Sequence, residues 1–346
     1  MGAIAVIGAG IAGLTVTAKL AAHGHEVALF DKSHGPGGRC ATRRSAVGAF
    51  DHGAPGFSAS SAAFRARVAA WRQAGWVCGD DDEGQAAAEA AERGSSLIYG
   101  VPSMNALARQ LSAQLPARVT LHTDCQVAAI EPDTGGGAWR LRLSDGITSA
   151  ARFDAVAVAV PAEQAAVLLA PEAVLADRMH RVRSDPCWTV MTAWARPLPV
   201  PLPSGLSGDA SRVLSTARRD DLRTGRTPVA DVACRWVLHA TPQWTADHLD
   251  ARSEVVIAEL LRAFERQLGA SLPAPSHAVA HRWRYAQVVC PCSEPCGWHA
   301  ALRLGACGDA WHAHGNNGSI APDGIERAWL SGQALAQQVH STLSSR

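Results

Sequence analysis

Three glycines near the N-terminus have the spacing of a phosphate-binding turn. Gly8, Gly10 and Gly13 follow a short apolar run, residues 3–7, and precede an apolar stretch that extends to residue 23. Glycines at these positions permit a tight turn and allow a pyrophosphate to approach the N-terminus of the following helix. Unpaired N–H groups and the helix dipole favour negative charge there. The spacing therefore predicts a dinucleotide site between a buried strand and a helix.

An acidic residue at the end of the next apolar run supports this prediction. Residues 26–30 have the pattern of a second strand, and Asp31 follows directly. A carboxylate here would accept hydrogen bonds from the ribose hydroxyls of an adenosine, and it disfavours a 2′-phosphate. Residues 3–7 and 26–30 therefore predict a strand–helix–strand unit of a parallel sheet.

Two further segments could contact a longer cofactor. Gly37 and Gly38 would let the backbone pass close to a second stretch of pyrophosphate, and Arg39 would face its charge. Near the C-terminus, Gly308 and Asp309 offer a carboxylate for a ribityl hydroxyl. Three separated elements that close on one extended cofactor favour FAD over NAD.

These elements resemble the FAD-containing oxidoreductases of the glutathione-reductase-like fold, in the amine-oxidase branch, and within it the renalase-like family. The motifs that carry the resemblance occur in order along the chain: GGRCATRR at 37–44, FDHGA at 50–54, VPSMNAL at 101–107, WVLHATPQW at 236–244, HRWRYAQ at 281–287, GDAW at 308–311 and AWLSG at 328–332. The resemblance implies tightly but non-covalently bound FAD. It also implies oxidation of isomeric dihydronicotinamides (α-NAD(P)H-like, or 2- and 6-dihydro forms) to NAD(P)+, with O2 reoxidising the flavin to give H2O2.

Two segments depart from the family's pattern. Residues 55–57 are Pro-Gly-Phe where the family usually has Gln-Tyr-Phe, and residues 312–324 are longer than in the bacterial members. Both are expected where substrate and flavin meet, so other flavin substrates stay open: an amine, or a carbon–carbon bond in a biosynthetic intermediate. A third hypothesis is a non-catalytic binding protein on the same fold. The intact glycines, Asp31 and Asp309 count against it.

The expected cofactor contacts come from these segments and from their neighbours. They are Gly8, Gly10, Ile11, Ala12, Gly13, Asp31, Lys32, Gly38, Arg39, Ala54, Pro55, Val127, Gly308, Asp309 and Ile325.

Three side chains are candidates for catalysis. His239 could make a polar contact over the flavin or be a structural histidine, and Arg43 and Arg284 could bind substrate phosphate or stabilise the reduced flavin anion, unless they are surface ion pairs. Three aromatic residues could wall the pocket or pack in the core: Trp236, Trp283 and Trp311.

Lysine is nearly absent from the chain. Lys19 lies in the predicted first helix and Lys32 at the end of the second strand, so neither should reach the flavin N5. Related amine oxidases place a lysine there through a water, and its absence argues against ordinary amine oxidation.

The cysteines and loop histidines do not predict a metal site. Cys290, Cys292 and Cys296 match no common zinc spacing, and His312 and His314 are expected to be loop residues. A disulfide reductase is excluded because the chain lacks a second nucleotide domain and a redox pair. Covalent attachment of the flavin, by His or Cys, stays open.

The composition is that of an ordinary globular protein. A chain of 346 residues suits about two domains. The 32 basic and 31 acidic side chains nearly cancel, so no net field favours nucleic acid or an anionic membrane. Nine cysteines, an odd number without a regular framework, suit a reducing compartment. With no evident leader or membrane span, we expect a cytoplasmic enzyme whose partners are a small-molecule substrate and O2.

The remaining patterns predict the elements that position the site. Helices are expected at 63–77, 103–115, 245–268 with Thr245 as a possible cap, and 325–340. Strands are expected as a meander over 119–160 and at 188–195, 211–217, 232–240 and 302–307. Residues 80–83 have the composition of a solvated linker, and residues 197–203 that of a loop. The predicted fold class is α/β: a Rossmann-type FAD domain (1–62, 96–167 and 281–346) interleaved with a mixed-sheet substrate domain with helices (63–95 and 168–280).

Overall fold

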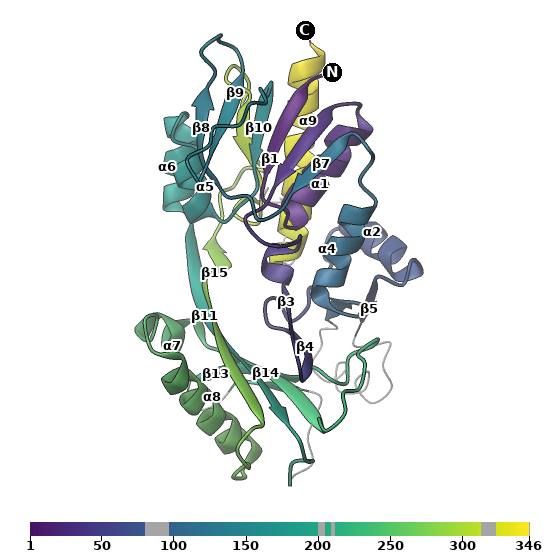
Figure 1. Cartoon of the computed structure of the whole chain (residues 1–346), viewed down its shortest axis with the longest axis vertical. Helices are drawn as coiled ribbons and strands as arrows, with labels where there is room; N and C mark the ends of the chain where they lie inside the picture. Colours follow the sequence, from purple (N-terminus) through teal and green to yellow (C-terminus); the bar gives the residue numbers. More distant parts are fainter. Residues whose placement is uncertain (80–96, 200–204, 209–211, 313–322, 346) are drawn as a thin grey trace.

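The computed structural model describes residues 1–79, 97–199, 205–208, 212–312 and 323–345. Two sheets lie one above the other along the long axis of the molecule (Figure 1). The long strands β11 (Arg183–Trp194) and β15 (His277–Cys290) belong to the lower sheet and extend toward the upper one. The predicted linker at 80–83 lies outside the described residues, as does part of the proline-rich loop at 197–203.

The upper sheet has six strands and contains the predicted strand–helix–strand unit. Its order is β16 (Gly297–His299), β17 (Leu304–Ala306), β10 (Ala155–Val158), β1 (Ala3–Ile7), β2 (Glu26–Phe30) and β7 (Val119–His122). All neighbours are parallel except the edge pair β16–β17. Burial on both faces explains why the central strands are apolar throughout.

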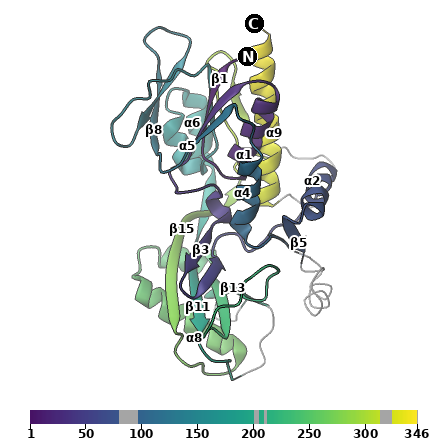
Figure 2. The same cartoon turned by 45° about the vertical axis from the view of Figure 1, so that its right-hand side comes forward.

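Helices and a hairpin cover the two faces of this sheet. One core contains residues of α1 (Ile11–Ala22), α2 (Ala62–Gln73), α4 (Met104–Ala113) and α9 (Gly324–Ser344). A second core joins the sheet to the hairpin β8–β9 (Val127–Pro132 and Trp139–Leu143) and to α5 (Ala162–Leu168) and α6 (Ala173–Arg181). Figure 2 shows the two sets on opposite sides. The upper part is therefore a three-layer Rossmann-type unit.

The lower sheet has five antiparallel strands in the order β12 (Gly205–Ser207), β13 (Leu214–Arg219), β14 (Cys234–Ala240), β11 and β15. A core on one face joins it to α8 (Ser253–Leu268), which follows the short α7 (Pro242–Asp247). The hairpin β3–β4 (Thr42–Ser45 and Gly48–Asp51) packs on the other face, where Phe50 contacts Met191 and Val237. The short pair β5–β6 (Val77–Gly79 and Ile98–Gly100) and the turn η1 (Gly38–Cys40) complete the chain.

Two predicted elements were wrong in detail. The meander over 119–160 does not form, because β7 pairs with β2 in the upper sheet while β8 and β9 make a separate hairpin. The helix over 245–268 is two helices, and Thr241 rather than Thr245 caps the first one. Thr245 is buried and its Oγ1 accepts a hydrogen bond from the N–H of Trp188 at 3.1 Å.

The sheets also qualify the predicted domain limits. The boundary between residues 280 and 281 falls inside β15, which pairs with β11 over its length. Residues of α2, from the segment 63–95, pack in the same core as α1 and α9. In the described part of the chain, every helix is too short or too polar to cross a membrane.

Candidate functional site

The first glycine turn has room for a ligand at one position only. A Cβ on Gly13 would lie 1.7 Å from the carbonyl oxygen of Gly8, and Gly8 itself has a φ of +105°. A Cβ on Gly10, in contrast, would meet no atom within 4 Å. Helix α1 has no side-chain cap and no acidic residue in its first turn. No side chain of the described residues caps the first N–H groups of α1, and the space beside Gly10 is open, which fits a pyrophosphate.

Asp31 lies at the carboxyl end of β2, beside this turn. Its carboxylate accepts hydrogen bonds from the N–H groups of Ala9 at 2.6 Å and Ser33 at 2.8 Å. These bonds hold the carboxylate beside the glycines and leave further lone pairs for ribose hydroxyls. The following Lys32 is exposed. The hairpin that starts at Val127 is attached at the same place, because the Cys125 N–H donates to the Asp31 carbonyl at 2.9 Å.

The other two predicted cofactor segments come together through an ion pair. The guanidinium of Arg39 donates to Asp309 Oδ2 at 2.8 Å and to Oδ1 at 2.5 Å. Gly38 lies against the first turn, since its Cβ would be 3.6 Å from the Gly10 Cα. Beside Gly308 a Cβ would meet nothing within 4 Å. Segments from the start, the first fifth and the end of the chain thus meet.

Residues 51–55, which we call the strap, cross from the hairpin β3–β4 back to the upper unit. The lower sheet holds two of its carbonyls: Trp283 Nε1 donates to the His52 oxygen at 2.8 Å, and His239 Nε2 lies 3.0 Å from the Gly53 oxygen. A Cβ on Gly53 would come within 2.1 Å of a backbone oxygen of the η1 turn, so the strap lies directly against this turn.

The upper end of the strap is held equally closely. The Ala54 N–H donates to the carbonyl of Arg39 at 2.9 Å, and a guanidinium N–H of Arg223 donates to the carbonyl of Pro55. The strap therefore contacts the same Arg39 whose guanidinium pairs with Asp309. Ala54 and Pro55, two of the predicted cofactor contacts, belong to the strap.

The buried side chain of His239 contacts the backbone of the strap. A carbonyl can only accept, so Nε2 carries the proton that it donates to Gly53, while Nδ1 lies 3.4 Å from the hydroxyl of Thr216. Burial lowers the pKa of His239 to about 4. The side chain is thus neutral with both nitrogens partnered, which is the structural alternative left open by the sequence.

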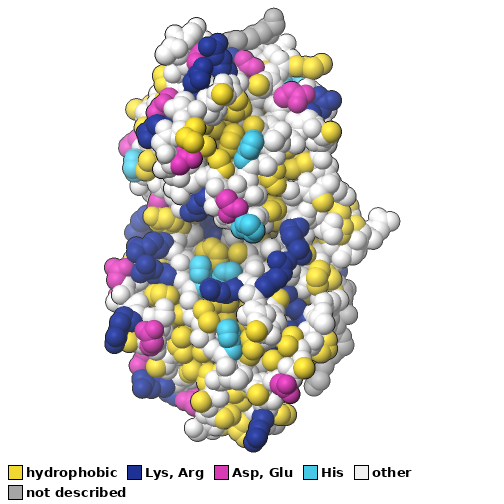
Figure 3. Space-filling view, viewed as in Figure 1, with side chains coloured by type: hydrophobic (Ala, Val, Ile, Leu, Met, Phe, Trp, Pro, Cys, Tyr) yellow, Lys and Arg dark blue, Asp and Glu magenta, His cyan; other side chains and the backbone are white. Residues whose placement is uncertain are grey.

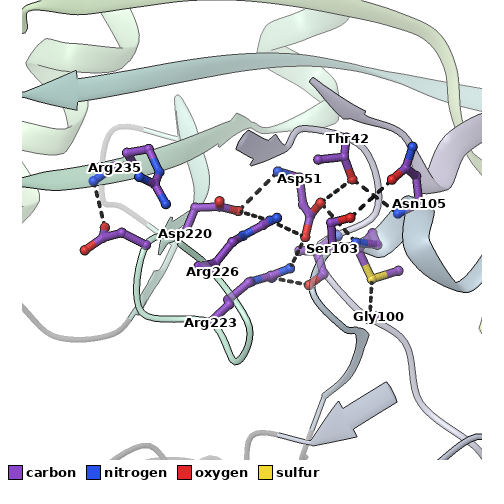
Figure 4. A network of polar contacts seen from close by, with 12 residues as sticks. Thr42, Asp51, Gly100, Ser103, Asn105, Asp220, Arg223, Arg226 and Arg235 are labelled. Atoms are coloured by element: carbon purple, nitrogen blue, oxygen red, sulfur yellow. Dashed lines mark hydrogen bonds and ion pairs between the residues drawn. The ribbon is translucent and has the colours of Figure 1, made fainter. Parts of the chain in front are cut away.

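A buried ionic network anchors the start of the strap (Figure 4). One carboxylate oxygen of Asp51 accepts from the Thr42 hydroxyl at 2.5 Å and from the N–H of Met104, at the start of α4, at 3.0 Å. The other accepts from Arg223 at 2.9 Å and from Arg226 at 2.7 Å. The Asp51 side chain is fully buried.

A second carboxylate completes this network. Asp220 accepts from Arg226 at 3.0 Å and from the backbone N–H of Asp51 at 3.1 Å. Burial raises the pKa of Asp220, and its Oδ2 has no hydrogen-bond partner. Two acids and two arginines from β4 and from the loop after β13 are thereby balanced in charge. The sequence motifs include Asp51, but the sequence analysis assigned no role to it or to its partners.

Aromatic rings gather beside the strap. The ring of His52 lies 4.7 Å from that of His281 and 5.2 Å from that of Trp283, and the two β15 rings are 4.5 Å apart. Burial, followed by His281 and Arg43, lowers the pKa of His52 to about 4. Trp283 thus lies beside the strap, whereas Trp236 and Trp311 are fully buried in two hydrophobic cores. His52 and His281 were not among the predicted site residues.

The structure brings one of the two candidate arginines to this group. Arg43 lies on β3, and its charge contributes to lowering the pKa of His52 and His281. Arg284 lies on the opposite face of β15 from His281 and pairs with the exposed Asp250 at 3.2 Å. Its side chain is directed to the face opposite Trp283, and its contacts are those of a surface ion pair.

The start of α9 is capped by the chain itself. The N–H of Ile325 donates to Asp323 at 2.9 Å, and the fully buried Glu326 accepts from the N–H groups of Ser60 and Ser61 at 2.7 Å. These contacts place Ile325 next to the segment that follows the strap. Most of the predicted 312–324 loop, including His314, lies outside the described residues.

All nine cysteines are free thiols. Burial raises the pKa of Cys296 to about 11, so it is a poor thiolate ligand. Within the described residues, His, Cys, Asp and Glu form no group suited to a metal ion.

The fold and the site together define an FAD-dependent oxidoreductase of the Rossmann type. Residues 6–71 match the model of an NAD(P)-binding Rossmann-like domain, and residues 87–340 match that of the flavin containing amine oxidoreductases. Because the second match covers more than half of the chain, the protein belongs to the flavin containing amine oxidoreductase family.

Solved structures share the fold over the whole chain at low identity. A protein from Exiguobacterium sp. 255-15, assigned as a protoporphyrinogen oxidase, is 14% identical with a TM-score of 0.65, covering 97% of this chain and 98% of its own. An oxidoreductase from Methanosarcina mazei is 14% identical with a TM-score of 0.59, covering 97% and 100%. A double mutant of putrescine oxidase is 13% identical with a TM-score of 0.63, covering 99% of each chain.

The glycine turn yields a paired prediction. Gly10→Ala should leave the fold unchanged, because its Cβ meets no protein atom, yet weaken FAD retention at least tenfold by filling the space before α1. Gly13→Ala should instead destabilise the apoprotein. Flavin absorbance per protein and thermal unfolding of the apoprotein distinguish the two. Full FAD occupancy in a well-folded Gly10→Ala variant would contradict this placement of the pyrophosphate.

The ionic network predicts a large effect of one neutral substitution. Asp51→Asn leaves Arg223 and Arg226 without their shared carboxylate oxygen and should lower the free energy of unfolding by about 3–5 kcal/mol. Asp250→Asn, which removes an exposed partner of two surface arginines, should cost less than about 1 kcal/mol. Urea unfolding measures both. If the two variants lost similar amounts of unfolding free energy, the buried network would contribute no more to stability than an exposed ion pair.

The neutral histidines predict how stability depends on pH. In the unfolded chain His52 and His239 take up a proton below about pH 6.5, but in the folded chain only near pH 4. Their stabilising effect is therefore complete above pH 6.5 and lost as the pH falls toward 4, by up to about 3 kcal/mol for each. His239→Gln should flatten this slope, because it removes one of the two buried groups that titrate. Unfolding free energies measured at several pH values test this, and a slope unchanged in His239→Gln would contradict it.

Proposed function

We propose that the protein is an FAD-dependent oxidase of renalase type, which takes hydride from an isomeric dihydronicotinamide and uses O2 as the final acceptor. When bound, FAD supplies a two-electron acceptor at N5, whose electrons O2 can remove to give H2O2. The residues that would hold it are those of the glycine turn, Asp31, the pair Arg39–Asp309, and the strap. The protein's own task is then to bind and orient the donor.

The scarcity of lysine carries this proposal. The whole chain has two lysines, and both are exposed on the Rossmann unit: Lys19 on α1 and Lys32 after β2. An ammonium substrate must lose a proton before its carbon can release hydride. A dihydronicotinamide needs no such base, because hydride loss itself makes the ring aromatic.

The titratable groups beside the strap support the same conclusion. His52 is neutral with a pKa of about 4, which makes it a weak base at neutral pH. The other histidines described there are His239, which is committed to Gly53 and Thr216, and His281, whose pKa is also lowered by burial. These side chains can orient and shield a donor without removing a proton from it.

A second candidate function keeps the flavin and changes the substrate. The family includes amine oxidoreductases by name, and two structural neighbours are described as acting on putrescine and protoporphyrinogen. The Pro-Gly-Phe sequence at 55–57 also differs from the renalase-like pattern. An amine or a carbon–carbon bond of a biosynthetic intermediate is therefore the alternative, and a colourless purified protein would instead favour a binding role without catalysis.

Anaerobic titration of the purified yellow protein tests the proposal. Isomer-containing NAD(P)H should bleach the oxidised flavin band, near roughly 450 nm, much faster than ordinary β-NAD(P)H does. A panel of amines is the comparison. If no nicotinamide isomer reduces the flavin but an amine does, the renalase-type proposal is wrong and the alternative is favoured.

A further inference from the structure

The guanidinium of Arg43 faces the lower sheet at the edge of the site. In the hairpin β3–β4, Arg43 pairs directly with Phe50, so the two side chains share one face. Phe50 packs on the lower sheet, with its ring stacked on His277 at 5.8 Å between centroids. The neighbouring Arg44, opposite Ala49, points to the other face of the hairpin.

Two histidines of β15 lie on the face that Arg43 approaches. His277 and His281 are four residues apart on one strand and therefore project from the same side. β15 is the edge strand of its sheet, so both histidines lie next to solvent and are only partly buried. Burial, and after it the charge of Arg43, lowers the pKa of each.

Arg43 supplies the positive charge of this group. Arg43 is exposed and makes no ion pair or hydrogen bond within the part of the chain that the structure describes. Arg223 and Arg226, in contrast, are paired with the Asp51 carboxylate. His52, which contacts His281 and is only 7% exposed, adds a buried Nδ1 without a hydrogen-bond partner.

The surface around this group is accessible. Figure 3 shows, on the face seen in Figure 1, a hollow between the upper and lower parts, with histidine and basic side chains around it and an acidic side chain at its upper rim. Next to the strap, the rings of His52, His281 and Trp283 lie within 5.2 Å of one another.

We propose that Arg43, His277 and His281 form a binding site for an anionic group of the substrate, a carboxylate or a phosphate. A guanidinium binds either anion through two parallel N–H donors, and neutral imidazoles add further N–H donors. The inference deepens the proposed function, since it assigns negative charge to the substrate. It also disfavours diamines, whose ammonium groups would meet an unpaired guanidinium.

Direct anion binding tests this site without turnover. The FAD-loaded protein is titrated with inorganic phosphate and, separately, with acetate, while the histidine NMR signals are followed against pH. His277→Gln and His281→Gln assign the signals. A bound anion favours the imidazolium form, so it should raise the pKa of His277 and His281 by about half a unit or more. A stronger response to phosphate or to acetate identifies which of the two anions the site prefers.

Two matched variants locate the effect. Arg43→Gln should weaken anion binding at least tenfold, whereas Arg44→Gln should leave it unchanged because that side chain points away. The inference is overturned if neither anion shifts the two histidines, or if both variants weaken binding equally.

Substrate pairs connect this site to the reaction. With a reduced nicotinamide mononucleotide, which carries a phosphate, Arg43→Gln should lower kcat/KM for flavin reduction at least tenfold. With the corresponding phosphate-free riboside the variant and the wild type should react alike. If no nicotinamide reduces the flavin, the proposed function fails while the NMR titration still decides the anion site. Equal losses with both members of the pair would contradict a role in binding the phosphate.

Discussion

The burial of Asp51 between two arginines is the interaction on which the rest of the site depends. Its carboxylate joins the end of β4, the loop after β13 and the first N–H of α4, which are far apart in the sequence. Such a buried group adds little net stability when it is complete, because each charge loses its hydration. When it is broken, however, an uncompensated charge remains. The network therefore acts mainly by specifying one arrangement of the hairpin, the loop and the helix.

That arrangement determines the geometry of the strap. Beyond Asp51, carbonyls of the strap are held by Trp283 and His239 from the lower sheet and by Arg223 from the loop. The strap then meets Arg39, which pairs with Asp309 at the other end of the chain. Backbone held at this many points presents a rigid surface to a cofactor, and pre-organisation of this kind lowers the cost of positioning a reacting group. Residues of both sheets therefore contribute to the candidate cofactor site.

Local patterns predicted the parts of this structure that depend on local chemistry. An apolar run, three glycines and an acid sufficed for the Rossmann unit. Arg39 and Asp309 were each expected to contact one cofactor, but their direct ion pair was not predicted. Non-local pairing was not predictable in the same way: β7 joins β2 rather than its neighbour β8. The arginines of the Asp51 network lie more than 160 residues from their partner, in a charged stretch that resembles a solvated loop. The alternation of HRWRYAQ could have separated His281 and Trp283 from Arg284, because successive side chains of a strand face opposite sides.

We infer that the strap, the glycine turn and the Arg39–Asp309 pair together hold one FAD. A crystal structure of the yellow protein tests it most directly. We predict that the pyrophosphate lies at the N-terminus of α1 beside Gly10, with the isoalloxazine ring against the backbone of Gly53 and Ala54. A flavin ring bound elsewhere, or density for a cofactor that avoids the strap, would contradict the account.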